Sequence, residues 1–566
     1  MTAAGNDPMS IVVQGAALVS FIWSCTVFVV QSIGIYQILR SHSAPGPPPA
    51  STTSVPDNEI PHITIIRPVK GIEVGLYECL ASTFQLAYPK SKFTIHLCVS
   101  TADDPAYPVL QQLRADFPDI DARIFVEDDD PLLHGADGHV NNLGPNPKIR
   151  NMSRAYREAK GDLIWIVDCN IWVGSGSAAR MVDKLCGFRP NGERATPYKL
   201  VHQLPLVLDI ENASSASSTE EEHGLLPKPG ATDLPRAQHN PPRSRSLLGH
   251  GGRLEEMFMA TSHAKFYCAI NTVSIAPCTI GKSNMFRKSH LDRFTDPAAN
   301  PLLSASDSTR GRGLDFFSSY ICEDHLLGDL IWRSQLSPAT GDGAFNQHGL
   351  VFGEPVIQPI AGMSVSSYVA RRVRWLRVRK WTVLAATLVE PGIEPFLCSL
   401  HVAFALTSLP WARDRLFGSP DALLSSAPPT WGSMAGIWLF TVTAWMLLDW
   451  WFSTRLGRLA SVEVDSNTPG FAMGSSRRGG VPRRPFLQFL GAWLGRESLA
   501  LPIWTWAVLL GTTVDWRGKK FQVRMDMSVV ECDDGNKGKR KRTSAALSVP
   551  SSDTSRPSSR NKDRVD

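Results

Sequence analysis

The chain has 566 residues, enough for several domains, and 43% of them are hydrophobic, including 16 tryptophans. Its formal net charge of +5 is small for this length, so the composition argues against a general nucleic-acid-binding protein. The ten cysteines are scattered without a CxxC pair, which argues against a zinc module and a disulfide framework and fits a reducing compartment.

The first predicted element is a transmembrane anchor at residues 11–39, after a short N-terminal segment, residues 1–10. The anchor contains no charged residue and exceeds the roughly 20 residues that a helix needs to cross a bilayer. Its length and the absence of basic residues before it argue against a cleaved signal peptide. Arg40 follows directly, so the positive-inside rule places the next part of the chain in the cytosol. Residues 40–60 are rich in proline and predict an extended linker.

Residues 61–380 predict an α/β domain with a mostly parallel sheet. Short β-branched runs alternate with helix-like segments, a pattern typical of parallel βαβ units. The predicted strands lie within residues 62–71, 93–105, 121–130 and 161–170, and the predicted helices at residues 76–86, 109–116 and 153–160. Ligands of such open sheets bind beyond the carboxyl ends of the strands, where Asp104 and Asp168 fall.

Two later segments predict disorder rather than a packed structure. Residues 211–252 are rich in Ser, Pro, His, Glu and Arg and lack apolar periodicity, so we expect a disordered insertion. Residues 521–566 end in a polar, basic stretch, which predicts a largely disordered tail near anionic lipid.

Residues 381–520 predict a C-terminal membrane region with about two to three spans. The strongest candidate covers residues 430–452, and a weaker one covers residues 393–411. A third, residues 486–514, contains Arg496 and Glu497. If both charges lie at membrane depth, we expect them to face a partner or a cavity. Alternatively, the helix begins after Glu497, which is the alternative that we favour.

The run ARRVRWLRVRK, residues 370–380, contains six cations and no acid. It could flank a membrane, or its arginines could bind a phosphate-bearing substrate. Arg371 and Arg374 share one face of a helix, and the adjacent Trp375 could form a wall of a site or an interfacial anchor. An apolar stripe would also let the helix, residues 366–380, lie flat on the membrane; it consists of Val369, Val373 and Leu376.

Three acids could perform chemistry together with these arginines. Asp104 follows a strand, Asp168 ends a nearly all-apolar strand, and Asp324 follows Glu323 on a helix-like background. One acid could orient a nucleotide, one could hold a metal ion on a diphosphate, and one could deprotonate an acceptor hydroxyl. The arginines would then stabilise the charge on the departing phosphate.

The motifs that contain these residues resemble those of the ceramide glucosyltransferase (glucosylceramide synthase) family. RPVKG, DDP, NPKI, DLIWIVD, TSH, ICED and RVRW occur in the family's order over roughly residues 61–380, and membrane spans flank them. The resemblance implies a GT-A-like α/β domain and an inverting transfer of glucose from UDP-glucose to the primary hydroxyl of ceramide. The family pattern has three single aspartates and a (Q/R)xxRW motif.

For the acids, the resemblance implies that Asp104 contacts the nucleotide, Asp168 belongs to the diphosphate and metal site, and Asp324 is the catalytic base. The implied cofactor is Mg²⁺ or Mn²⁺. Many related transferases have a DxD motif at the second acid, whereas this chain has Asp168-Cys169-Asn170. A single carboxylate does not predict a tightly bound metal ion.

For the other motifs, the resemblance implies that Arg371, Arg374 and Trp375 lie near the diphosphate and the acceptor. His263 matches a histidine near the family's active site, where it has either a direct or a structural role. Lys148, in NPKI, is expected to approach the donor phosphates.

The implied partners are UDP-glucose, ceramide and membrane lipids, and no nucleic acid. The implied location is a Golgi or endoplasmic reticulum membrane, with several spans and a cytosolic catalytic domain. One alternative is a processive synthase of cellulose, chitin or hyaluronan type, which normally has more spans and a glutamine at the start of the motif. Another is a non-catalytic membrane adaptor. If the domain instead faced the secretory lumen, the sequons at Asn151 and Asn212 would be open to glycosylation.

Overall fold

The computed structural model describes residues 8–134, 143–210, 251–336, 344–417, 430–516 and 519–532. All elements described below belong to one unit, Met1–Glu531. The predicted insertion at residues 211–252 and the predicted tail at residues 521–566 lie largely outside the described residues. Those two predictions, and the predicted domain boundaries, therefore stay predictions.

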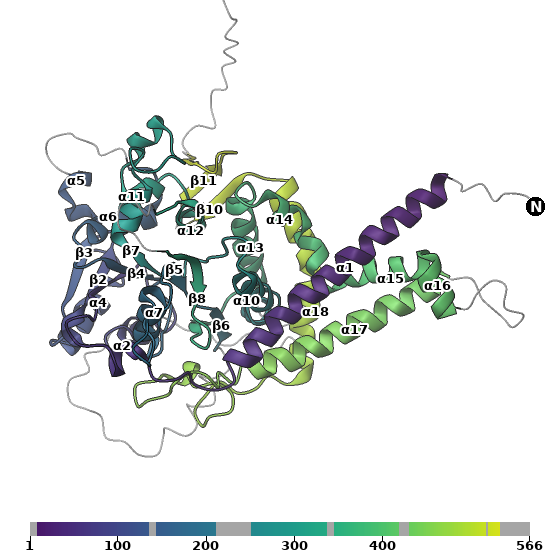
Figure 1. The fold of residues 1–566 in the computed structure, drawn as a ribbon, viewed down its shortest axis with the longest axis horizontal. Helices are drawn as coiled ribbons and strands as arrows, with labels where there is room; N and C mark the ends of the chain where they lie inside the picture. Colours follow the sequence, from purple (N-terminus) through teal and green to yellow (C-terminus); the bar gives the residue numbers. More distant parts are fainter. Residues whose placement is uncertain are drawn as a thin grey trace, which may run out of the picture. The chain divides into compact units, whose positions relative to one another are not determined.

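A seven-stranded sheet has the strand order β3-β2-β1-β4-β7-β5-β8 (Figure 1). Its first four strands are parallel to one another, β7 is antiparallel to β4 and β5, and β8 is parallel to β5. The strands are β1 (Ile63–Pro68), β2 (Phe93–Val99), β3 (Ala122–Val126), β4 (Leu163–Val167), β5 (Tyr198–His202), β7 (Ser283–Arg287) and β8 (Asn346–Leu350). The predicted α/β fold with a mostly parallel sheet is confirmed.

Helices cover both faces of this sheet, which explains why β1 and β2 are buried at every position. One face packs on α3 (Leu76–Ala81), α4 (Tyr107–Asp116) and α7 (Ser177–Cys186). The other packs on α6 (Pro147–Arg157), α11 (Lys288–Phe294) and α12 (Glu323–Arg333). The alternation of apolar strands with helix-like segments therefore predicted the parallel half of the sheet correctly.

The strand order reverses at β1, which has β2 on one side and β4 on the other. In open α/β sheets, ligands bind in the crevice outside the carboxyl ends of strands at such a switch point. The loops that follow β1, β2 and β4 are therefore the expected walls of a binding site.

Two smaller sheets and a long helical run complete the unit. Strand β6 (Pro205–Asp209) is parallel to β9 (Val356–Ile360). Strands β10 (Thr513–Trp516), β11 (Lys519–Val523) and β12 (Val529–Glu531) form an antiparallel sheet. The helical run consists of α9 (Gly251–Phe258), the π-helical turn η3 (Met259–His263) and α10 (Ala264–Val273).

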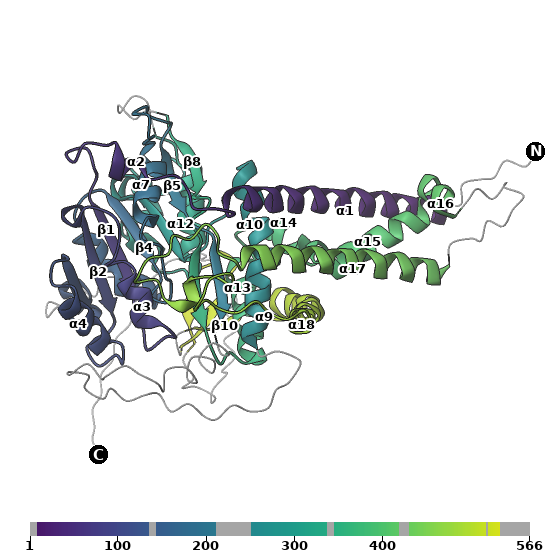
Figure 2. The same ribbon diagram turned by 90° about the horizontal axis from the view of Figure 1, so that it is seen from below.

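Within the described residues, two helices are long and apolar enough to cross a membrane: α1 (Pro8–Ser41) and α17 (Trp431–Leu456). A third span results if α15 (Pro395–Ser408) and α16 (Pro410–Phe417), bent by 83° at their junction, are taken together. In Figures 1 and 2, α1, α15 and α17 run side by side away from the sheet, and α15 contacts both of the others.

Two local expectations are wrong. Helix α18 begins at Phe486 and continues through Arg496 and Glu497 to Trp504, rather than starting after the charges. These charges are accommodated because buried polar partners surround them, as described below. The proline-rich linker is not a free extended spacer either: it contains one helical turn, α2 (Ala50–Thr53), whose N-terminal N–H groups are bound by the carboxylate of Asp183.

Candidate functional site

Lys148 lies in the first turn of α6 because Asn146 and Pro147 begin that helix. The side chain of Asn146 accepts hydrogen bonds from the backbone N–H groups of Lys148 and Ile149, at 2.8 and 3.2 Å. Pro147 occupies the first helical position, where its missing N–H costs nothing. The NPKI motif is thus a helix start that points a lysine at the edge of the sheet.

Asp168 directly follows β4 and lies between two ammonium groups. Its Oδ1 is 2.9 Å from Nζ of Lys148, and its Oδ2 is 3.0 Å from Nζ of Lys282. Lys282 precedes β7, and the antiparallel pairing of β4 with β7 brings its carbonyl to the N–H of Asp168 at 3.1 Å. Burial alone would raise the pKa of Asp168, but the two lysines outweigh it and hold the pKa well below its usual range.

Lys148 also reaches Glu323, at the start of α12, with 3.1 Å between Nζ and Oε1. Burial raises the pKa of Glu323. Burial alone would lower the pKa of Lys148, but Asp168, Glu323 and Asp324 together raise it. The ammonium group of Lys148 is therefore charged at neutral pH. It links Asp168 to α12, the helix that contains Asp324.

Asp324 lies against the segment that contains Lys282. A Cβ atom added at Gly281 would come within 2.9 Å of Oδ2 of Asp324, so the close approach requires glycine there. Asp168 and Asp324 consequently flank two consecutive residues, Gly281 and Lys282. We refer to Lys148, Asp168, Lys282, Glu323 and Asp324 as the lysine–carboxylate cluster.

Asp104 lies at the same edge of the sheet, beyond β2. Its Oδ1 accepts hydrogen bonds from the N–H groups of Gly71 and Ala106, both at 2.9 Å. Because Gly71 follows β1, the carboxylate joins the loops after two neighbouring strands. The structure therefore places Asp104 beside the expected crevice but not in contact with the lysine–carboxylate cluster.

His263 ends the π-helical turn η3 and stacks on Tyr267, with 5.1 Å between ring centroids. Burial lowers the pKa of His263 to about 3, and the nearby Arg372 and Arg379 act in the same direction. Its buried Nδ1 has no hydrogen-bond partner among the described residues. The imidazole is thus neutral at neutral pH. Burial raises the pKa of the neighbouring Tyr267 well above its usual range, and Asp324 acts in the same direction.

The predicted RxxRW motif lies on α13 (Val365–Arg379), where Arg371 is held by two other elements. Its Nε is 2.8 Å from Oε1 of Glu255, on α9, and its Nη2 is 3.5 Å from Oε1 of Gln358, on β9. The guanidinium group also stacks on Trp375, 4.8 Å from the ring centroid. Arg374, partly buried on the same helix, also has an interaction partner.

The apolar stripe of helix α13 packs against other parts of the protein. Val373 and Leu376 are buried against α9, α18 and the turn that follows α18. The guanidinium group of Arg377 is hydrogen-bonded to the backbone carbonyls of Thr513 and Trp506. Most cations of the run therefore have partners inside the protein, because segments remote in sequence supply carbonyl and carboxylate oxygens.

Few side chains of this site are available to bind a metal ion. Within the described residues, no group of three or more His, Cys, Asp or Glu side chains is arranged to hold a metal ion. Both oxygens of Asp168 already contact lysines. The residues therefore fit only a cation held mainly by substrate phosphates and water, which is how proteins commonly bind Mg²⁺.

The partners that organise this site could not be predicted from the sequence. Lys282 has no motif around it, and its role depends on the antiparallel strand that follows it. The pairing of Glu323 with Lys148, and of Glu255 with Arg371, joins residues more than 100 positions apart. Of these partners, only Glu323 was indicated by the sequence, because it is a carboxylate next to Asp324 on an apolar, helix-like background.

Comparison with known proteins matches the chain to glycosyl transferase family 21 over residues 24–217 and 238–529. A ceramide glucosyltransferase from Pyricularia oryzae is 53% identical over 525 residues, which cover 92% of this chain and 96% of the relative. One from Gibberella zeae is 46% identical over 548 residues, covering 96% and 98%. Among solved structures, a mannosyltransferase from Pyrobaculum calidifontis in complex with GDP-Man and Mn²⁺ is 14% identical, with a TM-score of 0.31 over 79% of this chain and 97% of that one.

Proposed function

The chain belongs to glycosyl transferase family 21, and we propose that it transfers glucose from UDP-glucose to the primary hydroxyl of ceramide with inversion. The proposal rests on the similarity, over 92% and 96% of the chain, to two relatives described as ceramide glucosyltransferases. This similarity also favours the transferase over a processive polysaccharide synthase or a non-catalytic adaptor. The lysine–carboxylate cluster supports it, because it combines cations for a diphosphate with a carboxylate for proton transfer.

The donor binds at the carboxyl edge of the sheet in this proposal. The ammonium groups of Lys148 and Lys282 face the diphosphate, and Asp104 contacts the nucleotide beyond β2. Each ammonium group has three N–H donors, so a lysine bound to Asp168 can also donate to a phosphate oxygen. Charge-assisted hydrogen bonds of this kind are stronger than neutral ones.

A divalent cation, Mg²⁺ or Mn²⁺, would be held with the donor by Asp168 as its one protein carboxylate. When bound, such an ion neutralises negative charge on the departing nucleotide. Because Asp168 also pairs with Lys148 and Lys282, we expect the cation to be held loosely.

Asp324 acts as the general base. It accepts the proton of the ceramide hydroxyl as that oxygen bonds to the anomeric carbon, and the bond from that carbon to the diphosphate breaks. UDP leaves with the electron pair while the two lysines stabilise its charge, and a β-glycoside results. The neutral imidazole of His263 lies on the acceptor side, where it can hydrogen-bond to ceramide.

The RxxRW residues border the diphosphate and the acceptor in this proposal. Arg371 is supported in that role by its fixed position between Glu255 and Trp375. A guanidinium group held in this way keeps its orientation, which a lysine at the same place would not reproduce.

We further propose a Golgi or endoplasmic reticulum membrane protein with its catalytic domain in the cytosol. The orientation is supported by Arg40 at the end of α1 and by the ten cysteines, which form no disulfide bond. Asn151 is buried and donates to the carbonyls of Val69 and Cys98, so its sequon is inaccessible in the folded protein. Glycosylation of Asn212, which lies outside the described residues, would contradict a cytosolic domain.

The direct test incubates membranes containing the full chain with ceramide and either labelled UDP-glucose or labelled UDP-galactose. We expect one labelled glucose on each acceptor lipid, in β linkage. A labelled polymer would instead support the processive alternative. Galactose transfer without glucose transfer would contradict the donor assignment.

Lys282→Met tests the diphosphate contact. We expect the affinity for UDP to fall about 10- to 100-fold, because one charge-assisted hydrogen bond is lost, while the affinity for uridine stays unchanged. Asp168 keeps Lys148 as a partner, so the fold should survive. Isothermal titration of the purified protein in detergent measures both affinities. Lys90→Met, at an exposed lysine paired with Asp119, is the matched control. An unchanged UDP affinity in Lys282→Met would remove Lys282 from the donor site.

A further inference from the structure

A cavity of about 80 Å³ lies between the last turns of α1 and α17, the two helices that are long enough to cross a membrane. Figures 1 and 2 show these two helix ends side by side, next to the catalytic domain. An apolar wall and a polar rim line the cavity, and they include Ile38, Phe452 and Leu456 in the wall and His42, Arg455 and Arg458 at the rim. Nothing in the mechanism above uses this cavity.

The cavity has a positive charge that the protein does not balance. No carboxylate lines it, and its two exposed arginines, Arg455 and Arg458, form no ion pair with another described residue. Burial lowers the pKa of His42 to about 4, so this imidazole is neutral at neutral pH. The charge of the cavity therefore comes from two guanidinium groups that lack an anionic partner.

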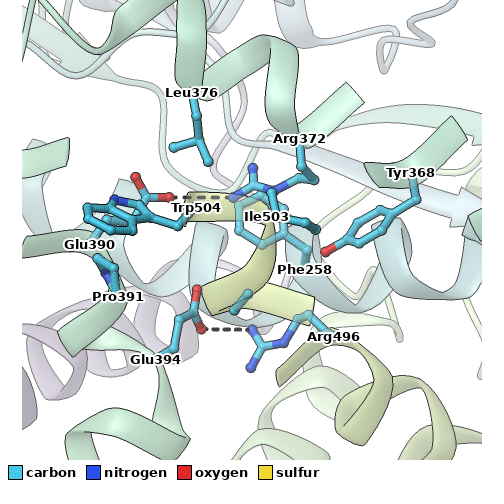
Figure 3. Close-up of a pocket in the computed structure, with 11 residues that line it drawn as sticks. Phe258, Tyr368, Arg372, Leu376, Glu390, Pro391, Glu394, Arg496, Ile503 and Trp504 are labelled. Atoms are coloured by element: carbon cyan, nitrogen blue, oxygen red, sulfur yellow. Dashed lines mark ion pairs between the residues drawn. The ribbon is translucent and has the colours of Figure 1, made fainter. Parts of the chain in front are cut away.

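Other arginines near the membrane helices have carboxylate partners. Figure 3 shows Arg372 beside Glu390, with 3.5 Å between Nη2 and Oε1. It also shows Arg496 beside Glu394, with 3.6 Å between Nη1 and Oε2. These arginines are buried, where an unpaired charge is costly. The two arginines of the cavity lie at its exposed rim instead, where an anion from outside the protein can reach them.

Two exposed aromatic residues place the cavity at the level of lipid head groups. Tyr36 and Trp451 each lie five residues before the last residue of their helix, which is about 7.5 Å at a rise of 1.5 Å per residue. Such aromatic side chains gather at the boundary between membrane and water. The ring of Trp451 also contacts the guanidinium group of Arg455, 5.4 Å from the ring centroid. The apolar wall of the cavity thus faces the hydrocarbon side of this boundary, and the arginines face the aqueous side.

The cavity also lies where the two helices join the catalytic domain. The N–H of Gly353, after β8, donates to Nε2 of His42 at 3.3 Å. Arg180, on α7, contacts both segments that leave the helices: the carbonyl of Pro47 at 3.5 Å and a carboxylate oxygen of Glu463 at 2.5 Å. A ligand that joins the ends of α1 and α17 would therefore stabilise the junction of the membrane helices with the catalytic domain.

From these observations we propose that the cavity binds the phosphate group of an anionic glycerophospholipid, of which phosphatidic acid is the simplest. The lipid lies in the leaflet that faces the catalytic domain. Arg455 and Arg458 donate hydrogen bonds to the phosphate oxygens, and the glycerol and the first part of the chains pack on Leu39 and Leu456. This binding site goes beyond the proposed function and is independent of the transfer reaction.

Size and charge favour a lipid phosphate with a small head group. One water molecule needs about 10–15 Å³ of cavity space, so this cavity has room for the oxygens of a phosphate but not for a nucleotide. A phosphate monoester has a charge of about −1.5 to −2 near neutral pH, which balances two guanidinium groups. A choline head group would bring a further cation beside them. Basic pockets between membrane helices are a recurring way to bind anionic head groups.

A double variant tests the inference. In Arg455→Gln combined with Arg458→Gln, we expect the Kd for phosphatidic acid to rise at least about tenfold, because charge-assisted hydrogen bonds are lost. Native mass spectrometry of the full chain, titrated in detergent with phosphatidic acid or phosphatidylcholine, measures the Kd. Arg478→Gln combined with Arg483→Gln is the matched control, because these exposed arginines follow α17 but do not line the cavity. The affinity for UDP reports whether each variant is folded.

A further variant distinguishes the cavity from a merely basic surface. Ala460→Phe fills the cavity and keeps both arginines, so it should also raise the Kd for phosphatidic acid at least about tenfold, even if the double variant does not fold. Soluble glycerol 3-phosphate should bind wild type at least about tenfold more weakly than phosphatidic acid, because it has no chains.

Three results would overturn the proposal. Equal affinities for phosphatidic acid and phosphatidylcholine would show that net charge is not recognised. Equal affinities for phosphatidic acid and glycerol 3-phosphate would identify a soluble phosphate, rather than a lipid, as the ligand. A Kd for phosphatidic acid that is unchanged in the folded variants, or raised equally in the matched control, would show that the lipid does not bind in this cavity.

Discussion

Asp324→Asn is expected to lower kcat for glucose transfer to ceramide by about 10²- to 10⁴-fold, the usual contribution of a general base. Asparagine has nearly the same shape and fits against Gly281, but it cannot accept the proton of the acceptor hydroxyl. The lysines that face the diphosphate keep Asp168 and Glu323 as partners. The affinity for UDP should therefore stay within about twofold of wild type.

Steady-state kinetics and titration with UDP measure these two effects on the same preparations. Asp329→Asn is the matched control, because Asp329 lies on the same helix and forms an ion pair with the exposed Arg333 at 2.9 Å. Near-normal turnover of Asp324→Asn would show that another group takes the proton. Glu323, whose pKa is raised by burial, would then be the first candidate, and Glu323→Gln would test it.

Arg496→Met is expected to have the largest effect on stability. The guanidinium group is buried in α18 and lies within 4 Å of carboxylates from three segments: Glu394, Asp449 and Glu497. Its removal leaves buried negative charges without their partner, which typically costs about 3–5 kcal/mol. Thermal unfolding of the detergent-solubilised protein, followed by intrinsic tryptophan fluorescence, should show a clear drop in Tm.

A second substitution separates charge balance from packing. Adding Glu497→Gln to Arg496→Met removes one of the unpaired carboxylates, so the double variant should be more stable than Arg496→Met alone. Arg455→Met, at an exposed arginine near the end of α17, should change the stability by no more than about 0.5 kcal/mol. If Arg496→Met unfolds at the wild-type temperature, the buried network does not contribute to stability as we infer.

The same network links the membrane helices to the candidate site. Arg496 donates to the hydroxyls of Thr261 and Ser262, at 3.0 and 2.5 Å, in the π-helical turn that ends at His263. Lys265, one turn further on, pairs with Asp449 of α17 at 2.6 Å. The charges that looked misplaced in an apolar helix therefore fix the π-helical turn that ends at the imidazole of His263.

Local sequence determined the parallel half of the fold and the position of two acids, Asp104 and Asp168, at the ends of strands. The runs around Ile63, Phe93, Ala122 and Leu163 form strands because β-branched and apolar residues favour a sheet covered on both faces. Asp168 follows from the same reasoning, since a carboxylate directly after a buried strand must emerge at the sheet edge. Strand formation and the position of Asp168 both depend on residues that are close to one another in the sequence.

Tertiary structure alone decided which charges meet. Asp168 acquires Lys282 only because β7 pairs antiparallel with β4, and Arg371 acquires Glu255 only because α9 packs on α13. Likewise, α18 can begin before Arg496 because buried carboxylates from distant segments offset its desolvation. Periodicity in a sequence indicates which face of an element avoids water, whereas the partner of a buried charge is set by the packing of segments that are remote in the sequence, as for Arg371 and Glu255.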